Sequence, residues 1–268
     1  MPFTISHTAI FLPFSRLLVR RRLLSATLIG AMVPDFRLFF PGISRVETHS
    51  AIALFTFCLP VGLLTYWLFE RWIKTPIVEV LPEGAYARWR PYAAEGDLRS
   101  LRQWLLAALG ILGGAISHLV WDGFTHEGGR GVRMFPVLDE SLIDIGQRHV
   151  PGMYVMQDLS SLVGMAAVLA VVCYALRSGA TSPVPERRVP HAERIRWMLL
   201  YVATAMAFGA AFYLGPRLGR PLSHSIVGRV SDVAIASLRG LAAALVCVSL
   251  ALQLRLRALR YRSSGPER

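Results

Sequence analysis

Residues 104–126 read WLLAALGILGGAISHLVWDGFTH, an apolar run whose ionisable side chains gather toward its end. A helix needs about 20 predominantly apolar residues to cross the hydrocarbon core of a membrane. The run therefore predicts a membrane-spanning helix that ends in a polar group of residues. Four further segments have similar length and composition, and Arg239 is the only charged residue within them. The five expected spans occupy residues 51–69, 104–121, 159–176, 197–215 and 233–254.

Two shorter apolar segments precede the first expected span, and neither is long enough to cross a membrane alone. Residues 8–19 and 23–34 are separated by a run of three arginines, which favours a hairpin of two short helices. The sequence thus predicts an all-α fold, a polytopic membrane helix bundle with five full spans plus this N-terminal hairpin. The expected divisions are a first membrane domain at 1–176, a linker at 177–196, two further spans within 197–254 and a basic tail at 255–268.

The composition of the 268-residue chain agrees with a membrane protein. It is 54% apolar and 17% charged, with a mean hydropathy of +0.46, whereas soluble domains carry about a quarter charged residues. The excess of basic over acidic residues is +12. A nucleic-acid-binding protein would not expose long charge-free apolar runs to water, so we expect no nucleic acid partner. The three cysteines form no close pair, which argues against disulfides and a cysteine-based metal site.

The positions of the basic residues predict the orientation of the chain. Most of the 29 Lys and Arg residues fall on one side of the expected spans, in the turn at 20–22, the loops at 70–103 and 177–196, and the tail after 254. Basic residues accumulate in cytoplasmic loops, where anionic lipid headgroups attract them. We therefore expect a multi-pass protein of the cytoplasmic membrane, with membrane lipids as partners.

The unusual polar residues lie on the opposite, less basic side. Ionisable residues at membrane depth are costly and usually functional, so their convergence on one side indicates a site facing away from the cytoplasm. The six residues are His7, Asp35, His49, His118, Asp122 and His126.

The spacing within the last three of these residues favours metal binding. Steps of four residues advance about 40° around a helix, so His118 and Asp122 share a face, which His126 continues if the helix persists. Two imidazoles and a carboxylate at this spacing can bind a divalent cation, and zinc suits these nitrogen and oxygen ligands. A capped helix end with interfacial histidines is the plain structural alternative. Taken singly, Asp35 in a proline turn and His49 beside a helix start have equally plain explanations.

The order of these motifs resembles the bacterial membrane-bound metal-dependent hydrolases, and within them an uncharacterised family of multi-spanning proteins. The resemblance covers roughly residues 1–165. A more distant similarity is to zinc-dependent phospholipase C and the amino-terminal domain of glycosylphosphatidylinositol phospholipase D, although their later His followed by Glu one turn on is absent. The matching motifs are His7, Gly30-Ala31-Met32-Val33-Pro34-Asp35, Thr48-His49, and Gly113-Gly114-Ala115-Ile116-Ser117-His118-Leu119-Val120-Trp121-Asp122 with His126.

The resemblance implies a site for two or more zinc ions, with these His and Asp residues as ligands and Asp122 able to bridge. We expect hydrolysis by metal-activated water of a phosphoester or other ester bond in a lipid-like substrate, with Asp122 and His126 as catalytic residues. Arg45, Arg130 and Arg133 lie on the same side and could hold a phosphate. A metal-ion or proton transporter, and a non-catalytic membrane subunit, remain alternatives.

Overall fold

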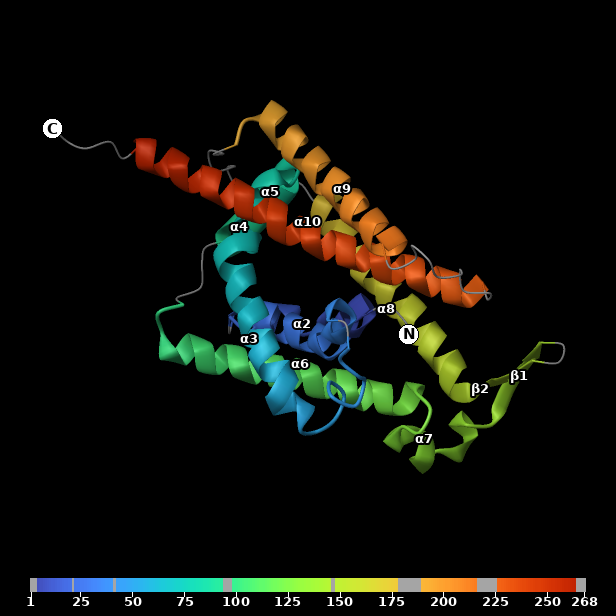
Figure 1. Ribbon diagram of the computed structural model, residues 1–268. Helices are drawn as coiled ribbons and strands as arrows, with labels where there is room; N and C mark the ends of the chain where they lie inside the picture. Colours follow the sequence, from blue (N-terminus) through green and yellow to red (C-terminus); the bar gives the residue numbers. More distant parts are fainter. Residues whose placement is uncertain are drawn as a thin grey trace. The chain divides into compact units, whose positions relative to one another are not determined.

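The computed structural model describes residues 4–20, 22–40, 42–93, 98–145, 148–177, 189–215 and 226–263. The chain divides into two compact units, and Figure 1 colours the ribbon along the sequence. The first unit comprises Met1–Trp67 and Gly96–Tyr174, and the second comprises Leu68–Glu95 and Ala175–Arg268. All six candidate site residues belong to the first unit.

The predicted N-terminal hairpin forms as four short helices in two arms, and the second arm packs against the first. Pro13 lacks an N–H and follows the first helix, so the first arm is broken there. Arg22 lies between the arms with a φ of 56°, a left-handed conformation that reverses the chain. The four helices are the 3-10 helix η1 (Thr4–Phe11), α1 (Ser15–Arg20), α2 (Leu24–Met32) and the 3-10 helix η2 (Val33–Phe39).

Helix α6 (Leu101–Thr125) packs closely against α2, and the two lie side by side in Figure 1. Glycines permit this approach. A Cβ atom on Gly30 would come within 2.2 Å of the carbonyl oxygen of Ile111, and one on Gly114 within 2.3 Å of the carbonyl oxygen of Thr27. Small residues let helix backbones approach in this way. The contact brings the end of the N-terminal hairpin to the polar end of α6.

The segment predicted as the first span, 51–69, differs from a single long helix. One π-helical segment lies within it and a second begins at its end, with Leu59 donating its N–H to the carbonyl of Leu54 and Lys74 to that of Phe69. Pro60 and Pro76 follow these segments, and a proline removes the i to i−4 hydrogen bond and shifts the pairing. The consecutive pieces are η3 (Leu54–Cys58), α3 (Leu59–Leu68), η4 (Phe69–Ile73) and α4 (Lys74–Val80).

The connector between α6 and the next long helix is more ordered than its glycine content suggested. It contains a two-stranded antiparallel sheet in which Ile143 pairs with Val150 and Asp144 with His149. This sheet was not expected, because its residues show no regular alternation. The connector comprises α7 (Arg130–Met134), the 3-10 helix η6 (Pro136–Leu138), β1 (Ser141–Ile145) and β2 (Arg148–Pro151), and α8 (Gly152–Arg177) follows it.

In the second unit, two long helices pack side by side, as Figure 1 shows. The hydroxyl groups of Tyr201 and Ser249 lie 2.7 Å apart and join them. Pro190 precedes the first of these helices, which starts six residues before the predicted span, while residues 178–188 of the expected linker lie outside the described residues. The unit's helices include α5 (Glu83–Trp89), η5 (Arg90–Tyr92), α9 (His191–Leu214) and α10 (Ile226–Ser263).

The predicted all-α membrane architecture is confirmed, but the expected span at 51–69 is not among the candidate spans of the described residues. Four helices among the described residues are long and apolar enough to cross a membrane, as expected of a multi-pass membrane protein. At 1.5 Å per residue even α9, the shortest of them, exceeds the roughly 30 Å of a hydrocarbon core. The four candidate spans are Leu101–Thr125, Gly152–Arg177, His191–Leu214 and Asp232–Leu259.

Candidate metal centre

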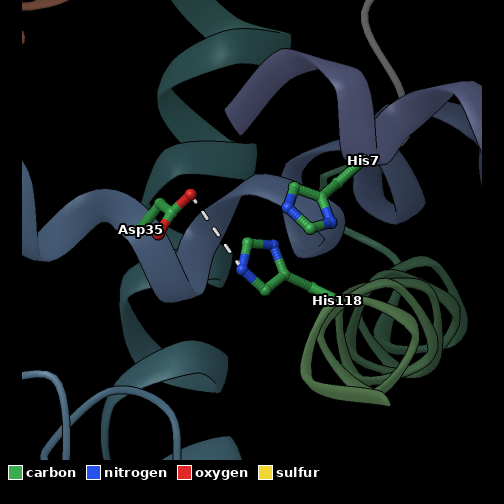
Figure 2. A group of neighbouring side chains, drawn as sticks. All are labelled: His7, Asp35 and His118. Atoms are coloured by element: carbon green, nitrogen blue, oxygen red, sulfur yellow. Dashed lines mark ion pairs between the residues drawn. The ribbon is translucent and has the colours of Figure 1, made fainter. Parts of the chain in front are cut away.

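The six predicted site residues come together in the first unit from four parts of the chain. His7 lies on η1, Asp35 on η2 and His49 in the turn before η3, while His118 and Asp122 lie near the end of α6 and His126 directly follows it. Figure 2 shows three of these side chains, which extend toward one another from η1, η2 and α6. The side chain of His126 is 17% exposed and the other five are at most 8% exposed. The result is a buried cluster of imidazoles and carboxylates.

The orientation of His118 is fixed from α2. Its Nδ1 lies 2.7 Å from the carbonyl oxygen of Ala31, which can only accept a hydrogen bond. In the neutral ring the lone pair therefore sits on Nε2, which lies 3.7 Å from Asp122 Oδ2 and 4.0 Å from Asp35 Oδ2. Figure 2 marks the second of these contacts. The ring presents a free nitrogen to both carboxylates.

His49 is held in a similar way by its neighbour in sequence. The Oγ1 of Thr48 lies 2.7 Å from His49 Nδ1, and the opposite nitrogen, Nε2, points into the cluster. That Nε2 lies 3.4 Å from Asp122 Oδ2 and 3.5 Å from Asp35 Oδ1. Within the described part of the chain, the buried Nε2 atoms of His49 and His118 both lack a hydrogen-bond partner. Buried polar atoms are rarely left without one.

Asp122 occupies the middle of the cluster, and its two oxygens face different neighbours. Oδ1 lies 3.8 Å from His7 Nε2 and 3.5 Å from His126 Nδ1. Oδ2 lies near His49 and His118 and accepts a hydrogen bond of 2.6 Å from Arg45 Nη2. One carboxylate therefore connects two sets of histidines.

Asp35 is kept ionised by its neighbours. Burial would raise the pKa of this carboxyl, but the adjacent His49 and His118 rings and the hydrogen bond from Thr4 Oγ1, 2.8 Å long, hold its pKa below the ordinary value. An ionised carboxylate among histidines is the form that binds a cation.

Two histidines at the edges of the cluster are kept neutral. The His7 ring stacks on His118, with 3.9 Å between ring centroids. Burial, with the adjacent His118, lowers the pKa of His7 to about 4. Burial and the nearby Arg45 guanidinium lower the pKa of His126, despite the opposing effect of Asp122. Neutral imidazole is the form that coordinates metal or accepts a proton.

The separations suit shared coordination of a cation. Two ligands that each lie about 2.0–2.1 Å from one tetrahedral zinc ion are roughly 3.3 Å apart. The nitrogen-to-oxygen distances around His49 and His118, 3.4–4.0 Å, lie near or above this value and exceed an ordinary hydrogen bond. Two groups of three residues have ligand atoms within 4.8 Å of one another: His7, Asp35 and His118, and His49, His118 and Asp122. The donor set and the free nitrogens fit a zinc-type cation.

Comparison with known proteins places the chain in an uncharacterised family. A domain of unknown function, DUF4184, matches residues 1–250. The chain belongs to this family. No curated protein and no solved structure matches the chain. The DUF4184 match includes every element of the candidate metal centre, from η1 to the end of α6, and extends to the last spanning helix.

Threonines are the part of the DUF4184 centre that the sequence interpretation missed. Thr4 bonds to Asp35, while Thr48 and Thr125 each lie beside the Nδ1 of the histidine that follows them. The Thr-His pair, which occurs at 48–49 and at 125–126, could have indicated these contacts in the sequence, although such pairs are common. A threonine hydroxyl can orient a ring and fix which nitrogen is free.

Two other described histidines are exposed and belong to neither group of potential metal ligands. His149 is exposed on β2 and bonds to Asp144 Oδ1 at 2.7 Å. His191 is exposed at the start of α9, and His224 lies outside the described residues. The buried Oε1 of Gln157, on α8, has no hydrogen-bond partner among the described residues, and Gln157 does not belong to either metal-binding group.

Proposed function

We propose that this DUF4184 protein is an integral-membrane metal-dependent hydrolase. The observation that carries the proposal is the pair of buried, unpartnered Nε2 atoms of His49 and His118, both facing ionised carboxylates. A divalent cation would satisfy all of these groups at once. Zinc suits the mixture of imidazole and carboxylate.

The residues on the two sides of Asp122 can serve two ions. His118 has one free nitrogen, so it can bind only one ion at a time. His49 and His118 face the Oδ2 side, and His7 and His126 face the Oδ1 side. A carboxylate that bridges two cations in this way is common in hydrolytic sites. We therefore assign Asp122 as the shared ligand.

The chemistry implied is hydrolysis at the open edge of the cluster. A bound cation would lower the pKa of water toward 7 and polarise the substrate oxygen. His126 is the most exposed of the six side chains, and its lowered pKa leaves the ring neutral at pH 7. We assign His126 to accept the proton of the attacking water, with Asp122 orienting its ring through the 3.5 Å contact.

The connector after α6 supports a lipid-like substrate. Helices α6 and α8 are consecutive candidate spans, so the residues between them begin and end at one membrane surface. Large apolar side chains there are exposed, and contact with lipid or with an acyl chain would remove them from water. These are Met134, Phe135, Val137, Leu142 and Ile143. From the distribution of basic residues we propose that this surface is the outer side of a bacterial cytoplasmic membrane.

The test is a comparison of metal content and turnover in detergent. Wild-type protein is expected to retain zinc and to release product from a phosphatidic acid or a polyprenyl phosphate, and Asp122→Asn is expected to lose both properties. His149→Ala, at an exposed residue, serves as the control. Zinc flux into proteoliposomes without turnover of any ester would contradict the hydrolase and indicate a transporter.

A further inference from the structure

Arg45 is built into the same turn that presents His49. The carbonyl oxygen of Arg45 accepts hydrogen bonds from the backbone N–H groups of Thr48, at 3.1 Å, and His49, at 2.8 Å. The turn is closed further by Ser44 and Glu47, which exchange hydrogen bonds between backbone and side chain. The backbone of Arg45 is thus fixed relative to a candidate metal ligand.

The side chain of Arg45 is partly exposed beside the buried centre. It is 37% exposed, whereas Asp122 is 8% exposed. Its Nη2 donates to Asp122 Oδ2 over 2.6 Å, and this is the guanidinium's one hydrogen bond within the described part of the chain. A guanidinium carries five N–H donors in a planar fork. Most of these donors therefore remain available on the solvent side, next to the candidate metal ligands.

The other two arginines singled out on this side do not reach the cluster in the same way. Arg133 is exposed, and its Nη1 donates to the carbonyl oxygen of Gly128 at 2.6 Å. Arg130 is exposed at the start of α7. Arg45 alone of the three contacts a candidate metal ligand among the described residues.

A permanent positive charge beside a cation site has a chemical consequence. Like charges a few ångströms apart repel. The Arg45 guanidinium therefore disfavours binding of a cation that is not accompanied by an anion. The repulsion is removed when an anion lies between the guanidinium and the cation. A neutral carboxylic ester supplies no such charge, whereas a phosphoester carries anionic oxygens that match the guanidinium fork.

We propose that Arg45 and the metal centre together form a phosphoryl-binding site, which narrows the substrate to a phosphoester. This inference rests on the proposed function. Arg45 keeps its contact with Asp122 or exchanges it for the substrate, and its free N–H groups bind the non-bridging oxygens of the phosphoryl group. Arg45 is a substrate-binding residue that selects for the anionic group.

Binding of two phosphate compounds to zinc-loaded protein tests the proposal without turnover. The probes are inorganic phosphate and dihexanoyl phosphatidic acid, measured by calorimetry in detergent, with zinc content determined on the same samples. Arg45→Gln is expected to weaken binding about ten- to one-hundredfold, the usual effect of losing a charged hydrogen bond, while zinc is retained. Arg133→Gln, the matched control, is expected to bind like wild type.

The two probes distinguish the source of the phosphoryl group. A larger loss with phosphatidic acid identifies a lipid headgroup, and an equal loss identifies free phosphate; both results support the site. Affinity within twofold of wild type for both probes, with zinc retained, overturns it. If Arg45→Gln loses zinc, the affinity of Arg45→Lys for the two probes is measured instead. An affinity between those of wild type and Arg45→Gln supports the site, and an affinity equal to that of wild type overturns it. Wild-type protein without zinc would instead contradict the proposed function.

Discussion

His118 and Ala31 connect the centre to the closest helix contact in the first unit. The His118 Nδ1–H group donates to the Ala31 carbonyl oxygen, 2.7 Å away, so that α6 and α2 are joined at the level of the centre. Metal-binding histidines usually make such a second hydrogen bond, which fixes the ring orientation and the tautomer. The helix contact therefore determines which nitrogen of His118 faces the carboxylates.

Replacing His118 is expected to abolish metal binding. His118→Ala removes the one residue shared by both groups of potential ligands, so zinc affinity should fall by at least about a hundredfold, more than the loss of an outer-shell partner would cost. Mass-spectrometric metal analysis of purified protein provides the measurement, and His149→Ala is the control. Equal zinc content in both variants would rule out His118 as a ligand.

The close contact between α2 and α6 gives a test of how packing supports the centre. A Cβ atom on Gly114 would collide with backbone atoms of α2, whereas one on Gly113 would meet nothing within 4 Å. Gly114→Leu should push the helices apart, lower the thermal unfolding midpoint and reduce zinc content. Gly113→Leu makes the same chemical change on an open face and should leave both values unchanged. Similar behaviour of the two variants would disprove the role assigned to the contact.

Thr4 provides a milder perturbation of the ligand set. Thr4→Val keeps the shape of the side chain but removes the hydroxyl that donates to Asp35 Oδ2. Loss of such a partner typically costs ten- to one-hundredfold in metal affinity, so zinc should be retained but bound more weakly in a competition with a chelator. Thr125→Val should weaken it less, because Thr125 contacts His126 at the exposed edge. An affinity for Thr4→Val equal to that of wild type would contradict this account.

The titration of His7 predicts a pH dependence of the metal-free protein. Its pKa of about 4 in the folded state lies below the ordinary 6.5, so unfolding takes up a proton between these values. The stability contributed by neutral His7 is complete above pH 6.5 and is lost as the pH falls toward 4, by up to about 1.4 kcal/mol per pH unit. His7→Phe keeps an aromatic ring beside His118 but cannot titrate.

Thermal unfolding from pH 7 to pH 4.5, after removal of metal by a chelator, provides the measurement. The unfolding midpoint of wild type should fall more steeply with decreasing pH than that of His7→Phe. Parallel curves would show that His7 is not the titrating group.

Orientation in the membrane is tested by cysteine labelling. In a background without the native cysteines, Glu127→Cys lies beside the centre and Ala192→Cys lies near the start of α9; both residues are exposed. An impermeant thiol reagent added to intact cells should label the first and not the second, because the basic loops predict a cytoplasmic position for residue 192. Labelling of both residues from outside would contradict the predicted topology, and labelling of residue 192 alone would indicate the opposite orientation.

The sequence predicted the features that depend on local pattern. Runs of apolar residues predicted helices at all four candidate spans, and the four-residue spacing of His118 and Asp122 predicted that they share a helix face. The six candidate residues also lie near one another, and their coordination of metal stays a prediction. Each of these properties depends on residues that are close in sequence, or on the preference of apolar runs for lipid and of polar residues for water.

Features that depend on packing could not be predicted in this way. The contact of Arg45 with Asp122 joins residues 77 positions apart, and the hydrogen bond from Thr4 to Asp35 joins residues 31 apart. Side-chain directions at such sites follow from the path of the turns and from helix separation. The π-helical segments before Pro60 and Pro76 were missed for a different reason, since hydropathy does not register a change in hydrogen-bond spacing.

The separation of His7 and Ala31 from His118 along the chain bears on how the protein is made. More than one hundred residues lie between His7 and its stacking partner, and at about 5–20 residues per second their synthesis takes several seconds or longer. During that time the N-terminal hairpin carries Asp35 without the helix that completes the centre. The proposed metal can be captured only after α6 has docked on α2, so that loading would follow the synthesis of α6.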